Sequence, residues 1–138
     1  MKFISKNKKF KKYFKIKQKL IMRYPKLQFG IYGLQILKQV DLKIEQLEVC
    51  LKILKKYLKP YNKLKVLRWR CFPDIIVTKK PKDIRMGRGK GLVIYKHSPL
   101  QAGSLLFELS HIPEKIAYFI IILCIKKLPI VARFYKSD

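Results

Sequence analysis

The feature that most constrains this 138-residue sequence is its charge, because 33 Lys and Arg side chains stand against only 8 Asp and Glu. A formal net charge of +25 at pH 7 would repel itself in an isolated compact domain. The hydrophobic fraction of 49% still allows a packed core, and the length is that of one domain. We therefore expect a single core neutralised by a polyanion, with nucleic acid favoured over an anionic membrane surface.

No group of residues suggests catalysis, a metal ion or a cofactor. The cysteines are three in number, lie far apart and form no C-x-x-C pair, and neither histidine is at metal-ligand spacing. The few acidic residues include no pair with a credible acid/base arrangement. We expect the cysteines Cys50, Cys71 and Cys124 to be reduced, buried thiols, and the protein not to be an enzyme.

The first 40 residues contain 12 basic residues and no acid. Aromatic side chains alternate with lysines such as Lys8, Lys9, Lys11 and Lys12. A mitochondrial transit peptide is one interpretation, but such peptides favour Arg and Ser. A membrane-surface helix is another, although the apolar positions form no clean helical stripe. We favour a basic arm (residues 1–28) that lies along phosphate groups, followed by one domain (residues 29–138).

Apolar periodicity predicts two helices and several short strands. Residues 42–59 and 114–127 have helical patterns, with Asp41 as candidate N-cap of the first helix and Pro129 ending the second. The uncharged segment 116–125 is about half the length needed to span a bilayer, so we expect a buried core helix and no membrane span. A turn or strand edge is expected at Gly30 and Gly33. Strand-like runs occupy residues 67–72, 75–77, 92–95, 105–109 and 130–135.

The sharpest local feature is the glycine-rich basic segment at residues 85–91. It matches neither a Walker loop nor a dinucleotide-binding loop, and no helix pattern follows it. Three glycines allow close approach of the backbone to phosphates, and the neighbouring cations supply charge-assisted hydrogen bonds. The alternative is a flexible surface turn with solvated charges, which the large net charge disfavours. The residues concerned are Lys79, Lys80, Lys82, Arg85, Gly87, Arg88, Gly89, Lys90 and Gly91.

These segments, in this order, resemble the universal large-subunit ribosomal protein sixteen (L-sixteen) family. The similarity runs over about residues 27–136, and the combination of motifs is specific. The strand after Gly91 departs from the family pattern, because Tyr95 is the only residue of that pattern that this chain keeps. The matching motifs are FGIYGLQ (29–35), LKIEQLE (42–48), RCFPD (70–74), VTKKP (77–81), RMGRGKG (85–91), GSLLFE (103–108), IPE (112–114) and KLPI (127–130).

The resemblance implies an α+β fold with two helices packed on β-sheet, a basic N-terminal arm and a long glycine-rich basic loop. It implies a structural constituent of the large ribosomal subunit, with large-subunit rRNA, transfer RNA at the aminoacyl site and neighbouring ribosomal proteins as partners. Carried over by position, Arg85, Arg88 and Lys90 would contact RNA in the loop, and Lys79, Lys80 and Lys82 would lie on its stem. The arm would then anchor the protein to rRNA.

An organelle-encoded mitochondrial protein is the expected origin, ahead of a plastid or bacterial one. The sequence holds 27 Lys against 6 Arg, and 18 Ile against 3 Ala, which is typical of an AT-rich genome. A cationic protein on an anionic membrane surface is the main rival hypothesis. An RNA-processing enzyme is a weaker rival, since the sequence shows no carboxylate or histidine cluster.

Overall fold

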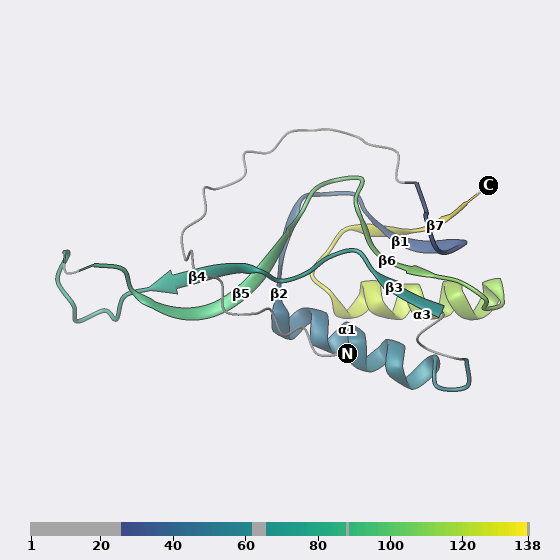
Figure 1. The fold of residues 1–138 in the computed structure, drawn as a ribbon, viewed down its shortest axis with the longest axis horizontal. Coiled ribbons are helices and arrows are strands. Elements are labelled where there is room, and N and C mark those ends of the chain that lie inside the picture. The colour runs from purple at the N-terminus through teal and green to yellow at the C-terminus, as the bar shows by residue number, and fades with distance from the viewer. Residues whose placement is uncertain (1–25, 62–65, 88, 138) are drawn as a thin grey trace.

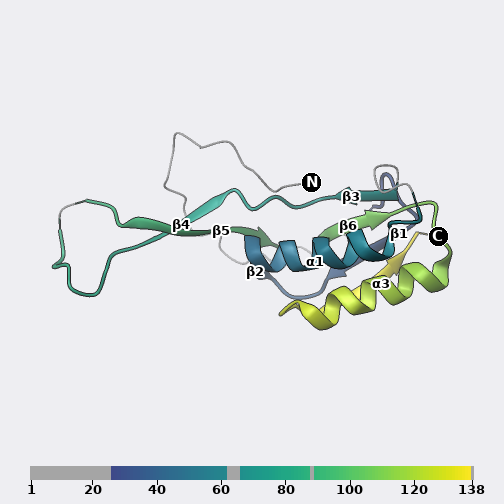
Figure 2. The ribbon, with the colours of Figure 1, turned by 90° about the horizontal axis from the view of Figure 1, so that it is seen from below.

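The computed structural model describes residues 26–61, 66–87 and 89–137, which form two helices and two antiparallel sheets (Figures 1 and 2). The expected α+β class is confirmed. Sheet A has the strand order β3 (Leu67–Trp69), β6 (Leu105–Leu109), β1 (Tyr32–Ile36) and β7 (Ala132–Lys136). Sheet B has the order β2 (Val40–Lys43), β5 (Leu92–Leu100) and β4 (Ile75–Lys79).

Helix α1 spans Ile44–Tyr57 and packs one apolar face into the core. Its buried side chains follow the spacing of three and four residues that the sequence predicts; they are Leu47, Cys50, Leu51 and Leu54. The prediction that Asp41 caps the N-terminus of this helix is wrong, because Asp41 lies in β2 opposite Pro99. The helix begins instead after Lys43, whose backbone N–H donates to the Gln46 side chain at 2.9 Å.

Helix α3 spans Glu114–Lys127, as the sequence predicts. The glutamate in its first turn and the lysines in its last turn both suit the helix dipole. The helix is less deeply buried than its apolar sequence suggests, because only one face contacts the core. Ala117, Ile120 and Cys124 are fully buried, whereas Tyr118 and Phe119 each expose about half of their surface.

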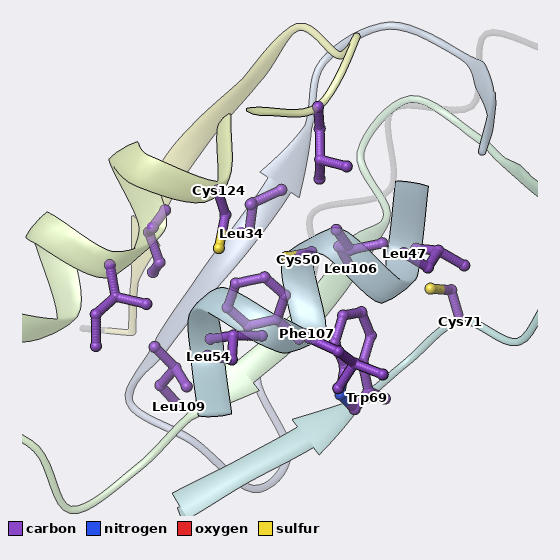
Figure 3. Close-up of a cluster of buried hydrophobic side chains, with 14 of the residues drawn as sticks. Leu34, Leu47, Cys50, Leu54, Trp69, Cys71, Leu106, Phe107, Leu109 and Cys124 are labelled. Carbon is purple, nitrogen blue, oxygen red and sulfur yellow. The ribbon is translucent and has the colours of Figure 1, made fainter. Parts of the chain in front are cut away.

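The hydrophobic core lies between the two helices and the facing side of sheet A (Figure 3). Leu34 of β1 and Phe107 of β6 are fully buried there, and Trp69 of β3 packs against the Phe107 ring with a centroid distance of 5.5 Å. Burial of such side chains stabilises the fold by about 1.5 to 3 kcal/mol each. Sheet A contains strands from both ends of the described chain, so this core holds the two ends together in one domain.

The three cysteines lie in this core as free, buried thiols, as the sequence predicts. A hydrogen bond with Cys124 and burial together raise the pKa of the Cys50 thiol far above its usual range. Burial raises the pKa of Cys71 to about 12. Both groups are therefore protonated at neutral pH and lack the thiolate that reacts or binds metal.

Sheet B carries the chain away from the core. Strand β5 pairs with β2 at residues 97–100 and with β4 at residues 92–97, so that the β4–β5 hairpin continues beyond the end of β2. Figure 1 shows this hairpin extending past α1 to one end of the molecule. Leu92, Val93 and Ile94 are correspondingly exposed on its outer part.

Candidate nucleic-acid interface

The loop between β4 and β5 is the part of the described chain farthest from the helices (Figures 1 and 2). Strand β4 ends at Lys79 and β5 begins at Leu92, so the loop comprises residues 80–91. Its cations Lys82, Arg85 and Lys90 are exposed, as is Lys79 at its base. Arg88, at the centre of the glycine-rich segment, lies outside the described residues. The structure thus brings four of the six predicted loop cations to the surface of one projecting hairpin.

Lys80 has a different position from the other loop cations. Its side chain is only half-exposed, and its ammonium group donates a hydrogen bond across the loop to the backbone carbonyl of Gly87. This bond joins the two arms of the loop. Lys80 therefore contributes to the shape of the loop as well as to its charge.

Glycine is needed at the three loop positions for two different structural reasons. Gly87 and Gly89 have φ angles of 107° and 81°, in the left-handed region that glycine adopts without strain, and both face open space. Gly91 has an ordinary φ, but a Cβ atom there would lie 2.5 Å from the backbone carbonyl of Lys79. Gly91 thus permits the close approach of the two strands at the base of the loop, whereas Gly87 and Gly89 shape its tip.

The tip presents backbone, cations and two apolar side chains to solvent. Met86 is fully exposed and Ile84 exposes 52% of its surface. Asp83 is the single acid between Lys79 and Lys90. A projecting loop of this kind can bind along a phosphate backbone, because its cations and backbone N–H groups are exposed to solvent and can donate hydrogen bonds to phosphate oxygens.

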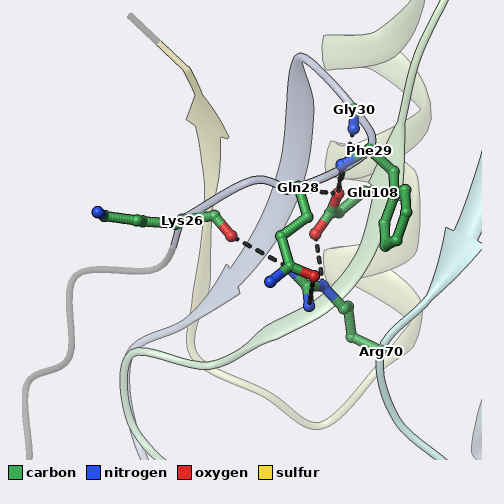
Figure 4. A network of polar contacts seen from close by, with 6 residues as sticks. All are labelled: Lys26, Gln28, Phe29, Gly30, Arg70 and Glu108. Carbon is green, nitrogen blue, oxygen red and sulfur yellow. Dashed lines mark hydrogen bonds and ion pairs between the residues drawn. The ribbon is translucent and has the colours of Figure 1, made fainter.

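A second polar site lies on sheet A, where the chain enters the domain (Figure 4). The Glu108 carboxylate accepts hydrogen bonds from the backbone N–H groups of Gln28, Phe29 and Gly30, at 3.2, 2.8 and 3.1 Å. Arg70 donates to the same carboxylate through Nε at 2.5 Å. Glu108 is fully buried, so these bonds replace the water that its charge has lost.

Arg70 extends this network back along the chain. Its Nη1 group donates to the Gln28 side chain and its Nη2 group to the carbonyl of Lys26, both at 3.0 Å. The guanidinium group therefore holds the segment that directly follows residue 25. Residues 26–28, which the sequence assigned to the arm, contact the domain here.

The Glu108 carboxyl titrates below its ordinary range. Burial raises the pKa of Glu108, but hydrogen bonds from the Phe29 N–H, the Arg70 side chain and the Gly30 N–H lower it further than burial raises it. The positive charge of Arg70 acts in the same direction. Glu108 is consequently ionised at neutral pH and keeps its four donors in place.

The sequence identified the loop but not this network. Glu108 and Arg70 are 38 positions apart, and neither was assigned a role. The available signal was a glutamate inside the otherwise apolar strand Leu105–Leu109, since a buried carboxylate needs donors nearby. The predicted arm residues Lys8, Lys9, Lys11 and Lys12 lie outside the described residues.

Within residues 26–61, 66–87 and 89–137, no group of three or more His, Cys, Asp or Glu side chains is arranged to hold a metal ion. Neither of the two described helices is long and apolar enough to cross a membrane.

Comparison with known proteins places these features in a family. Residues 5–135 match the family profile described as ribosomal protein L16p/L10e. The chain is 41% identical over 108 residues to the large ribosomal subunit protein uL16m of Acanthamoeba castellanii, covering 77% of this chain and 74% of the relative. It is 36% identical over 110 residues to uL16 of Bartonella bacilliformis, covering 80% and 78%. It is 35% identical over 129 residues to uL16 of Buchnera aphidicola, covering 94% and 93%.

Proposed function

The chain belongs to the ribosomal protein L16p/L10e family and is a structural, non-enzymatic constituent of the large ribosomal subunit, and we propose that its β4–β5 loop and basic arm bind large-subunit rRNA and help to shape the aminoacyl-tRNA site. The observation that carries this proposal is the hairpin that projects its cations beyond the helices. A loop in this position reaches RNA while the apolar core stays intact behind it.

Each loop residue has a part in this proposal. Lys79, Lys82 and Lys90 are exposed and contact phosphate groups, and Arg85 is exposed nearer the tip. Arg88, which stands between Gly87 and Gly89 in the sequence, adds a further positive charge.

The remaining loop residues give the loop its shape. Gly87 and Gly89 allow the tip to approach transfer RNA closely. Lys80 and Gly91 hold the loop in shape. Neighbouring large-subunit proteins are further partners.

We place the protein in mitochondria, as an organelle-encoded component. The relative from Acanthamoeba castellanii is a mitochondrial-type uL16m, and the Lys- and Ile-rich composition is typical of an AT-rich genome. Bacterial relatives at similar identity leave a bacterial ribosome as the alternative location. Purification of mitochondrial ribosomes followed by mass spectrometry would test the assignment, which a purely cytoplasmic ribosomal association would overturn.

The loop proposal is tested with Arg88→Ala combined with Lys90→Ala. We expect subunits with this variant to assemble but to retain less transfer RNA at the aminoacyl site, and the free protein to melt at the wild-type temperature. The rRNA-binding constant should depend less steeply on salt, by roughly 0.7 to 0.9 per lost contact. A control with Lys52→Ala and Lys55→Ala removes two charges from the exposed side of α1.

Unchanged transfer-RNA retention in the loop variant would contradict the functional role of the loop. A collapse of the melting temperature would show that the loop is structural. An equal loss in the α1 control would show that only net charge matters.

A further inference from the structure

Arginine is scarce in this chain, and its placement is uneven. Only 6 of the 33 basic residues are Arg. Three of them, Arg68, Arg70 and Arg133, lie on or beside the edge strands of sheet A. Arginine differs from lysine in presenting a planar fork of donors that matches phosphate groups, so three arginines on one sheet point to a specific use.

The strand register puts these arginines on the same face of sheet A. Arg68 pairs with Glu108, and Glu108 pairs with Gly33, so their side chains point to the same side. Arg133 pairs with Gln35, two residues beyond Gly33 and hence on that side as well. Arg70 is bonded to Glu108 and lies on this side too.

The opposite side of the sheet faces the helices. Leu34 and Ile36 alternate with Gly33 and Gln35 along β1 and are buried in the core. Phe134, next to Arg133, packs against Tyr118 of α3. The arginines therefore lie on the face that the helices leave uncovered.

Each arginine is held by a neighbouring group. Arg133 Nε donates to the side-chain oxygen of Gln35 at 2.7 Å, and Gln35 exposes only 5% of its surface. Arg70 is bonded to buried Glu108, and Arg68 lies over the ring of Phe29 at 5.7 Å. Arginines fixed in this way lose little conformational entropy when they bind a ligand.

The same face has an excess of positive charge. Glu108 is the only acid in the four strands of sheet A, and Arg70 already neutralises it. Arg68 and Arg133 therefore remain as exposed positive charges on opposite edge strands. Arg70 also holds the carbonyl of Lys26, which adds a further exposed cation beside this face.

We propose that this arginine face, in which Lys26, Arg68 and Arg133 surround the Arg70–Glu108 pair, is a second RNA-binding surface that binds the phosphate backbone of rRNA independently of the β4–β5 loop. The inference rests on the proposed rRNA binding and adds a site to it. The two edge strands are three strand spacings apart, about 14 Å, so Arg68 and Arg133 contact different phosphates. The loop then binds one region of RNA and the arginine face binds another.

The test measures the salt dependence of binding to full-length large-subunit rRNA for Arg68→Gln combined with Arg133→Gln. We expect the slope of log K against log salt to flatten by about 1.4 to 1.8, which corresponds to two lost contacts. Arg133→Lys keeps a charge and a donor for Gln35, and combined with Arg68→Gln it should flatten the slope by only about 0.7 to 0.9. Lys52→Gln with Lys55→Gln on α1 is the charge-matched control and should leave the slope unchanged.

Melting temperatures decide which variant carries the test. If the double Gln variant unfolds, Arg68→Gln alone replaces it, because Arg68 lies over an exposed ring rather than a buried group. That single change should then remove one contact.

The outcomes separate this inference from the proposed function. A wild-type slope in the arginine variants, with a reduced slope in the Arg88 and Lys90 variant, would overturn the arginine face and leave the loop proposal standing. Absence of rRNA binding by the wild-type protein would overturn both. An equal effect of the α1 control would overturn the arginine face, because net charge would then explain the binding. A loss of binding to anionic phospholipid vesicles with rRNA binding intact would overturn it in favour of a membrane contact.

Discussion

At the scale of single residues, Glu108 determines how the chain enters the domain. Its carboxylate accepts three consecutive backbone N–H groups and the Arg70 side chain, at a position with no access to water. Segment 26–30 would otherwise leave these N–H groups unpaired against sheet A. One buried acid in a chain with 33 Lys and Arg residues thus holds segment 28–30 against sheet A.

Replacement of Glu108 by Gln should lower the free energy of unfolding by about 1 to 3 kcal/mol at pH 7, because the uncharged side chain accepts the same donors less well. The pH dependence follows from the lowered pKa of Glu108. The ionised carboxylate stabilises the fold above the ordinary glutamate pKa of about 4.3, and this stabilisation is lost as the pH falls through the folded-state value.

Urea unfolding at a series of pH values between 7 and 3 measures this effect. The wild-type protein should lose stability over the acidic part of the range more steeply than the variant does. Identical pH profiles for the two proteins would contradict the role given to Glu108.

At the scale of secondary-structure elements, α3 combines a buried face with an exposed aromatic face. Ile120 and Ile121 are fully buried, whereas Phe119 exposes 51% of its surface and meets the Tyr57 ring of α1 edge to face. The uncharged sequence of the helix conceals this difference. The position of each side chain relative to sheet A and α1 decides its burial.

Ile120→Lys should destabilise the fold by more than about 3 kcal/mol, because it buries an unpaired charge in the core. Phe119→Lys is the matched control one residue earlier, where the loss of one aromatic contact should cost about 1 kcal/mol. Thermal unfolding followed by circular dichroism compares the two variants. Similar melting temperatures for both would show that α3 is not oriented as described.

At the scale of the whole molecule, the apolar core lies apart from the cations of the β4–β5 hairpin. The helices and one face of sheet A enclose the core, while the β4–β5 hairpin carries cations away from it. The other face of sheet A carries the arginines. This separation lets a chain of net charge +25 fold around a core and keep its charge at the surface.

Deletion of residues 1–19 removes nine lysines and none of the described core residues. We expect the truncated protein to keep its melting temperature, to bind rRNA with a flatter salt dependence, and to enter large subunits less efficiently. Sucrose-gradient analysis of subunits from cells expressing the truncated chain measures incorporation. Unfolding of the truncated protein, or normal incorporation, would contradict the interpretation of this segment as an RNA-binding arm.

Much of the local structure follows from the sequence. Helix α3 and strand β6 have the predicted bounds, because helical and strand patterns depend on neighbouring residues. Strand β5 is longer than predicted, and the last two residues of β2 were predicted as the start of the first helix, since those short segments are defined by their partners. The series of motifs in the chain also identifies the family, because a motif is recognised from the order of its residues without any geometry.

The sequence by itself determined the two helices, the α+β class, the basic loop and the ribosomal family, since each depends on local periodicity or on motifs. Only the tertiary structure decided that the strands form two sheets, that Glu108 binds Arg70 and segment 28–30, and that Gly91 lies against Lys79. It also gathered three arginines on one face. The physical reason is that strand order and register bring together residues far apart in the chain, and a local pattern carries no information on which strands will pair.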